Sequence, residues 1–123
     1  FFSVDVSFIS LTLVLPVAYR FLKDGGCAVC LIKPQFEVGK GRVGKKGVVR
    51  EPELHTEVIK KITAFAVQAG FSVAGLDYSP VRGPEGNIEY LMFLEKSPVP
   101  GMIAVDVPAL VARSHCELNG EHS

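Results

Sequence analysis

The chain has 123 residues, 48% of them hydrophobic, which suits one domain with a buried core. Lysine plus arginine and aspartate plus glutamate both number 13, and this balance excludes a strong overall field that would steer the chain to nucleic acid or membrane. No apolar run approaches the roughly 20 residues that span a bilayer. The three cysteines, two of them in one apolar stretch, indicate reduced thiols and a cytoplasmic location.

The first third of the chain predicts a strand, a helix and a second strand. Residues 1–5 are a short apolar run that ends in Asp5, and because the chain opens directly in this strand we expect a longer polypeptide. Thr12 is the predicted N-cap of a helix with Pro16 near its first turn, and a glycine pair ends that helix. The second strand covers residues 27–33. The connection is long enough for a helical crossover, so the two strands should be parallel neighbours.

The middle of the chain predicts a long loop, a helix and two further strands. The loop covers residues 34–50, and the helix runs from residue 51 to a glycine stop at residue 70. Strands follow at residues 71–78 and 88–95. Because the link between them is too short for a packed helix, the last strand should run antiparallel to the third.

The tail from Val105 predicts one short helix with Pro108 in its first turn. From His115 onward the residues are mostly polar, and we expect a frayed end there.

Three charged residues are predicted to converge on one edge of the sheet. Asp5 ends the first strand and Lys33 ends the second, and both strands run the same way. Glu89 lies near the start of an antiparallel strand, which is at the same edge. A lysine between two carboxylates is held protonated and can position a hydroxyl and stabilise a developing negative charge. The alternative interpretation is a salt bridge that only closes the edge of the sheet.

Five basic residues follow the second strand within a glycine-rich loop: Lys40, Arg42, Lys45, Lys46 and Arg50. The glycines predict a flexible flap over the same edge, and its charge suits the phosphate backbone of RNA or another polyanion. A solvated loop without a partner is the alternative. Residues 39–44 also match the pattern G-x-G-x-x-G, but no helix begins there, so a dinucleotide site is disfavoured.

The remaining polar residues predict no metal site. Cys27 and Cys30 are three apart on a strand and should point to opposite faces, which favours core packing over metal binding. His55, near the start of a helix, and the tail residues His115 and His122 are predicted to be surface histidines. Asn87 is predicted to serve a turn, with a place in the lining of the sheet edge as the alternative.

Several separated segments together resemble the TlyA family, haemolysin-like proteins that are similar to FtsJ-type ribosomal RNA 2'-O-methyltransferases. They are Asp5 to Leu11, Leu31 to Gly41, Gly47 to Arg50, and Ser79 to Tyr90. The resemblance implies an α/β fold with a partial Rossmann-like methyltransferase sheet, in which parallel strands precede a last antiparallel strand and helices lie on the faces. It further implies that residues 1–97 are the C-terminal portion of a catalytic domain whose cofactor-loop half is absent, followed by a tail at 98–123.

The resemblance also implies the chemistry. The cofactor would be S-adenosylmethionine, and Asp5, Lys33 and Glu89 match the catalytic set, whose first lysine has no counterpart here. Asp5, Val6, Ser7 and Phe8 would contact the methionine end of the cofactor. The substrate would be ribosomal RNA or a ribosomal subunit, held in part by the basic loop.

Two other functions stay open from the residues alone. One is a non-catalytic module for RNA binding or assembly that uses only the basic loop. The other is the haemolysin-type activity that the family name suggests. In addition, the apolar edge formed by residues 1–5 predicts self-association of the chain.

Overall fold

The computed structural model describes residues 2–4, 10–38, 49, 51–82, 86–98, 100–103 and 105–118. In chain order the elements are β1 (Phe2–Val4), α1 (Leu11–Phe21), β2 (Cys27–Ile32), the short 3-10 helix η1 (Pro34–Phe36), α2 (Pro52–Gln68), β3 (Phe71–Tyr78), β4 (Tyr90–Lys96) and α3 (Val107–Leu118). This order confirms the predicted succession of strands and helices. It adds η1 within the predicted loop and starts β4 two residues later than expected.

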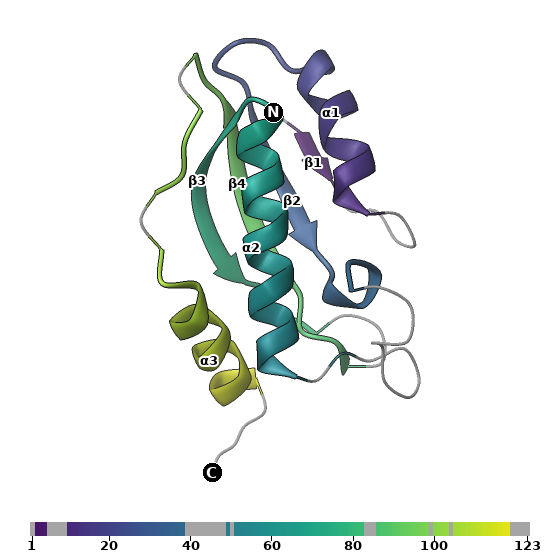
Figure 1. The fold of residues 1–123 in the computed structure, drawn as a ribbon, viewed down its shortest axis with the longest axis vertical. Coiled ribbons are helices and arrows are strands. Elements are labelled where there is room, and N and C mark those ends of the chain that lie inside the picture. The colour runs from purple at the N-terminus through teal and green to yellow at the C-terminus, as the bar shows by residue number, and fades with distance from the viewer. Residues whose placement is uncertain are drawn as a thin grey trace.

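The four described strands form one sheet in the order β1-β2-β4-β3 (Figure 1). β1 and β2 are parallel neighbours, as predicted, with Val4 opposite Cys30. β4 lies between β2 and β3 and runs antiparallel to both, so that Tyr90 is opposite Ile32 on one side and Tyr78 on the other. The antiparallel relation of the last two strands is therefore confirmed.

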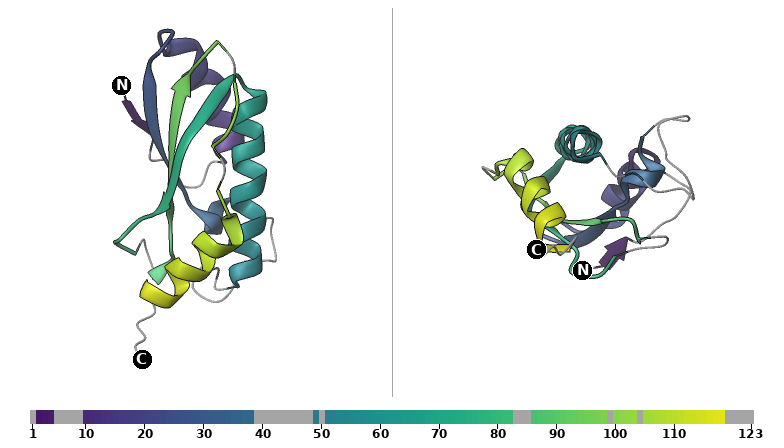
Figure 2. Two further views of the ribbon diagram at one scale, coloured as in Figure 1. Left: turned by 90° about the vertical axis from the view of Figure 1, so that its left-hand side faces the viewer. Right: turned by 90° about the horizontal axis from the view of Figure 1, so that it is seen from below.

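One face of the sheet carries the hydrophobic core, and α2 runs along that face (Figure 2). Every second residue of the two central strands is buried there: Ala28, Cys30, Ile32, Tyr90, Met92 and Leu94. All three helices contribute buried residues to the same core. On the opposite face Val29 and Leu91 are half-buried and Phe93 is 37% exposed. In the described residues, the expectation of helices on the faces is thus met on one face only.

The start of α1 differs from the prediction. Ser10, not Thr12, is the N-cap, and its hydroxyl accepts a hydrogen bond from the Thr12 amide at 3.1 Å. Pro16 consequently lies inside the helix and not in its first turn. Both Ser10 and Thr12 are good caps, and the choice depends on Glu37, whose carboxylate accepts from the Ser10 hydroxyl at 2.6 Å and from the Leu11 amide at 2.8 Å.

The tail is more ordered than predicted. Residues 101–103 pair with β3 through Val73, whose amide donates to the Gly101 carbonyl at 2.7 Å. α3 confirms the predicted helix with Pro108 in its first turn. It continues through His115 to Leu118, so the expected fraying was wrong for residues 115–118, and residues 119–123 lie outside the described residues. The helix persists because Val107, Leu110 and Val111 are buried in the common core.

Candidate active site at the end of β2

The structure brings Lys33 and Glu89 to the same edge of the sheet. Lys33 directly follows the last residue of β2, and Glu89 directly precedes the first residue of β4. The two strands are paired through Ile32 and Tyr90, so the charged residues occupy the next position on neighbouring strands. Both side chains are buried, with exposures of 8% and 6%. Asp5 and the other predicted cofactor contacts, Val6, Ser7 and Phe8, lie outside the described residues.

Gln35, on η1, was not singled out from the sequence, yet its side chain contacts Glu89. Its Nε2 donates a hydrogen bond to Glu89 Oε2 at 3.0 Å. The side chain is only 8% exposed. Its other polar atom, Oε1, is buried without a hydrogen-bond partner in the described part of the chain. Gln35 therefore supplies one donor to the Glu89 carboxylate and retains an unused acceptor.

Glu37 fixes the turn that carries Lys33 and Gln35. Its carboxylate binds the N-terminus of α1, where a negative charge is favoured by the helix dipole. Its backbone carbonyl accepts a hydrogen bond from Lys61 Nζ on α2 at 2.8 Å. The segment after β2 is thus bound to two helices, and this holds the site residues in place.

Asn87 connects the start of β4 to the end of the predicted basic loop. Its Oδ1 accepts a hydrogen bond from the Val49 amide at 3.0 Å, and the side chain is 2% exposed. The Val49 carbonyl accepts from His55 Nε2 at 2.8 Å. Val49 is therefore held at both backbone groups close to the site. The basic residues themselves, Lys40, Arg42, Lys45, Lys46 and Arg50, lie outside the described residues.

A second group of buried polar side chains joins α2, β4 and α3. His55 Nδ1 lies 2.9 Å from the Tyr90 hydroxyl and 3.0 Å from His115 Nε2. The Tyr90 hydroxyl lies 2.9 Å from Ser114 Oγ. The prediction of surface histidines was wrong for His55, which is 1% exposed, and for His115, which is half-buried. His122 lies outside the described residues.

The hydrogen-bond partners define the protonation of this group. A carbonyl oxygen can only accept, so His55 Nε2 carries the proton and Nδ1 of the neutral ring accepts. Burial lowers the pKa of His55 to about 4, outweighing the opposite effect of the Val49 carbonyl. Burial also lowers the pKa of His115 and raises that of Tyr90 to about 12. The whole group is neutral at neutral pH.

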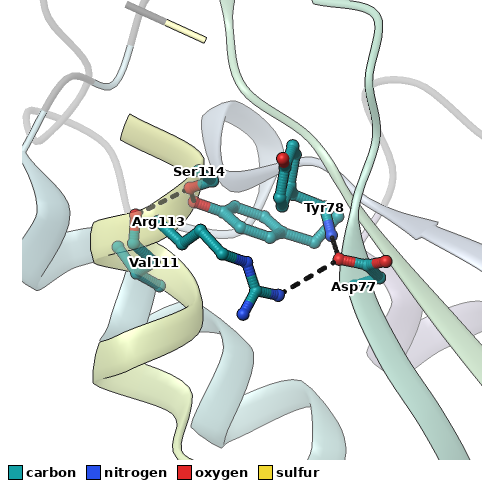
Figure 3. A network of polar contacts seen from close by, with 6 residues as sticks. Asp77, Tyr78, Val111, Arg113 and Ser114 are labelled. Atoms are coloured by element: carbon teal, nitrogen blue, oxygen red, sulfur yellow. Dashed lines mark hydrogen bonds and ion pairs between the residues drawn. The ribbon is translucent and has the colours of Figure 1, made fainter. Parts of the chain in front are cut away.

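Two residues of α3, Arg113 and Ser114, contact other parts of the molecule (Figure 3). Ser114 donates to the Val111 carbonyl at 2.7 Å, so the single proton of the Tyr90 hydroxyl is shared between two acceptors, Ser114 Oγ and His55 Nδ1. Arg113 reaches from α3 to Asp77 on β3 at 3.5 Å. Because both of those side chains are more than half exposed, the ion pair contributes little to stability. These contacts hold α3 against α2, β3 and β4.

The cysteines lie as expected on opposite faces of β2. Cys27 is exposed and Cys30 is buried in the core. Burial raises the pKa of the Cys30 thiol to about 12, so it stays protonated and unreactive. Among the residues that the structure describes, no three side chains of metal-binding type are gathered in one place.

Comparison with protein families identifies the family of this chain. A model for FtsJ-like methyltransferases matches residues 1–96. The chain belongs to the FtsJ-like methyltransferase family. The matched range includes β1 to β4 and the Lys33, Gln35 and Glu89 cluster, whereas α3 lies beyond it.

Curated relatives and a solved structure agree with this assignment. The chain is 48% identical over 94 residues to "Putative rRNA methyltransferase YqxC" of Bacillus subtilis, an alignment that covers 76% of this chain and 34% of the relative. It is 43% identical over 90 residues to "16S/23S rRNA (cytidine-2'-O)-methyltransferase TlyA" of Mycobacterium tuberculosis, covering 73% and 34%. A structure titled "Putative hemolysin from Streptococcus thermophilus" matches with a TM-score of 0.91 and 49% identity, over 96% of this chain and 43% of that one.

The chain thus spans about a third of the length of the curated relatives that it matches. The solved structure extends the similarity to nearly the whole chain. In the described ranges, no helix combines the length and the apolar character needed to cross a membrane.

Proposed function

We propose that the complete protein containing this chain transfers a methyl group from S-adenosylmethionine to a ribose 2'-hydroxyl of ribosomal RNA. The observation that carries the proposal is the position of Lys33 and Glu89 at one sheet edge, next to the paired residues Ile32 and Tyr90, in an FtsJ-like methyltransferase chain. Relatives whose names specify ribosomal RNA methylation support the choice of substrate. The fold is the second half of a Rossmann-like methyltransferase sheet.

Lys33 is the proposed catalytic residue closest to the reacting hydroxyl. A ribose hydroxyl is a weak nucleophile, and it must be aligned with the methyl group and lose a proton. The Lys33 ammonium would orient the hydroxyl oxygen and stabilise the negative charge that develops there. The methyl group would leave the sulfonium sulfur for that oxygen, and the hydroxyl proton would be released to water. Glu89, and Asp5 at the end of β1, set the charge and the position of Lys33. Because Lys33 and Glu89 are both buried, their interactions are weakly screened by water.

The described residues are compatible with the proposed cofactor. S-adenosylmethionine supplies an activated methyl group on a positively charged sulfonium. The carboxylate of Glu89 and the unused Oε1 of Gln35 make the edge rich in acceptors, which suits a nearby cation. Asp5, Val6, Ser7 and Phe8 are proposed to hold the methionine end of the cofactor.

The basic segment is proposed to bind the phosphate backbone of ribosomal RNA or of a ribosomal subunit. Val49, between Lys46 and Arg50, is fixed near the site by Asn87 and His55. Charge neutralisation by the segment predicts RNA binding that weakens steeply with salt. The protein is proposed to act in the cytoplasm, where its substrate lies.

Methyl transfer by the complete protein to ribosomal RNA tests this function. Labelled S-adenosylmethionine and RNA or subunits lacking the modification are the substrates. Lys33→Ala should abolish transfer while RNA binding persists, and Lys23→Ala, at an exposed lysine, is the matched control. An active Lys33→Ala enzyme would contradict the catalytic role. A wild-type protein without transfer, whose RNA binding depends on Lys45 and Lys46, would favour the binding module instead.

Self-association of the chain is also proposed. In the described sheet β1 is an edge strand, and the face opposite the core carries half-buried apolar side chains. Such surfaces tend to pair with a second chain or with another part of a longer one. Light scattering at increasing concentration should detect oligomers, and a monomer at all concentrations would contradict the proposal.

A further inference from the structure

We infer that Gln35 is a positioning residue of the methyl-transfer site, acting through its hydrogen bond to Glu89. The inference rests on the proposed function and adds a residue to it. Gln35 and Glu89 are 54 residues apart in the sequence, and the Nε2 to Oε2 distance is 3.0 Å. The contact joins the turn after β2 to the residue before β4, which are the two segments that carry Lys33 and Glu89.

The chemistry of a side-chain amide suits this task. A neutral N–H donor favours the charged carboxylate of Glu89 without neutralising it. An arginine or lysine here would pair with Glu89 and compete with Lys33 for it. A glutamate would place a second carboxylate beside the first and oppose ionisation of both. An amide therefore holds Glu89 in place and leaves its charge available to Lys33.

The unused end of Gln35 indicates that stability does not explain the residue. Its Oε1 is buried without a hydrogen-bond partner in the described part of the chain. Leaving such an acceptor unpaired costs about 1–3 kcal/mol. The hydrogen bond from Nε2 to the Glu89 carboxylate offsets this cost, so the side chain brings little net stability. A glutamine that brings little net stability and contacts a buried carboxylate at the candidate site is best explained by its effect on that carboxylate.

The surrounding contacts make Gln35 a rigid support. η1 is short, and the Phe36 amide donates to the Lys33 carbonyl at 2.9 Å. The next residue, Glu37, is bound to the N-terminus of α1 and, through its carbonyl, to Lys61 of α2. A donor on this turn has little freedom to move, so it restricts the Glu89 carboxylate to one orientation.

The first test measures activity and stability of Gln35→Met in the complete protein. Methionine matches glutamine in length but cannot donate. We expect kcat to fall roughly 10- to 100-fold with an unchanged KM for RNA, as for a displaced catalytic group. The melting temperature should change little, because loss of the donor to the buried Glu89 carboxylate destabilises the fold while removal of the unpaired Oε1 stabilises it.

The control is Gln68→Met, at an exposed glutamine that ends α2. It should change neither kcat nor KM. Full activity of Gln35→Met in an active wild-type background would overturn the inference while leaving the proposed function intact. A lower rate that is fully explained by a lower folded fraction at the assay temperature would also overturn it. Absence of methyl transfer by the wild-type protein would contradict both the proposed function and the role of Gln35.

A second test needs no activity and uses the 123-residue chain itself. The sequence has two glutamines, Gln35 and Gln68, so their side-chain amide signals in NMR spectra are assigned by their loss in the methionine variants. We expect the Gln35 signals to exchange slowly with water and to shift in Glu89→Gln, whereas the Gln68 signals should not respond. Gln35 signals that are insensitive to Glu89→Gln would overturn the inference.

Discussion

Glu89 and Tyr90 are neighbours in the chain, yet they belong to two buried polar regions of opposite character. Glu89 belongs to the sheet-edge group with Lys33 and Gln35. Tyr90 belongs to the histidine group with His55, Ser114 and His115. In the histidine group the side chains are neutral and joined by hydrogen bonds. In the sheet-edge group two side chains can carry charge and one acceptor is buried unpaired.

Under the proposed function, burial alone does not separate structural from functional polar residues. The histidine group is a network of polar contacts, which rigidifies the contact between α2, β4 and α3. The sheet-edge group contains buried residues that can carry charge and one unpaired acceptor among the described atoms, which is the arrangement expected of a site for chemistry. Substitutions in the first region should therefore change stability, and substitutions in the second should change activity.

The largest expected effect is on activity, in the sheet-edge group. Glu89→Gln in the complete protein should lower the rate of methyl transfer about 10²- to 10⁴-fold, because the charge that positions Lys33 is lost. The melting temperature should change little, since the amide still accepts the hydrogen bond from Gln35. Methyl transfer and thermal unfolding measured on the same samples test this. A stable variant with full activity would assign Glu89 to the structural class.

The next effect is the pH dependence of stability in the histidine group. The pKa of His55 is lowered by burial from its ordinary value of 6.5 to about 4 in the folded chain. Below pH 6.5 the unfolded chain binds a proton at His55 that the folded chain does not bind. The free energy of unfolding should therefore be highest above pH 6.5 and fall by about 3 kcal/mol in total as the pH falls toward 4. Urea unfolding at pH 7.5 and 5.0 should show about 2 kcal/mol of this loss.

The matched variant for that measurement is His55→Gln, which has no titrating ring. The variant should be less stable than the wild type at pH 7.5, but its stability should differ much less between pH 7.5 and pH 5.0. The pH dependence that remains is expected from His115, whose pKa is also lowered. If the pH dependence of the variant equals that of the wild type, other groups cause it.

The smallest effect is expected for Tyr90→Phe. Removal of the hydroxyl should cost about 1 kcal/mol, because Ser114 still donates to Val111 and His115 still lies within reach of His55. Methyl transfer should be unchanged. Tyr78→Phe, on the strand beside it, is the control for loss of a tyrosine hydroxyl. A drop in rate for Tyr90→Phe without loss of stability would break the distinction between the two regions.

The sequence by itself determined the element order and the convergence of Lys33 and Glu89 on one edge. Strand lengths, turn residues and the short link before β4 are local signals, and strand direction then follows. A signal for His55 was also present, because it is spaced helically with Val58, Ile59 and Ile62, all of which are buried. A polar residue on an apolar helix face is a better candidate for burial than for the surface.

Only the tertiary structure decided which polar groups meet. Gln35 contacts Glu89, which is 54 residues away in the sequence, and Glu37 contacts the start of α1, which is 26 residues away. His115 contacts His55 at a separation of 60 residues. No local sequence pattern selects any of these partners. Packing of the helices on one face of the sheet makes the selection. Hydrogen bonds act over about 3 Å, whereas sequence patterns report only the periodicity of burial.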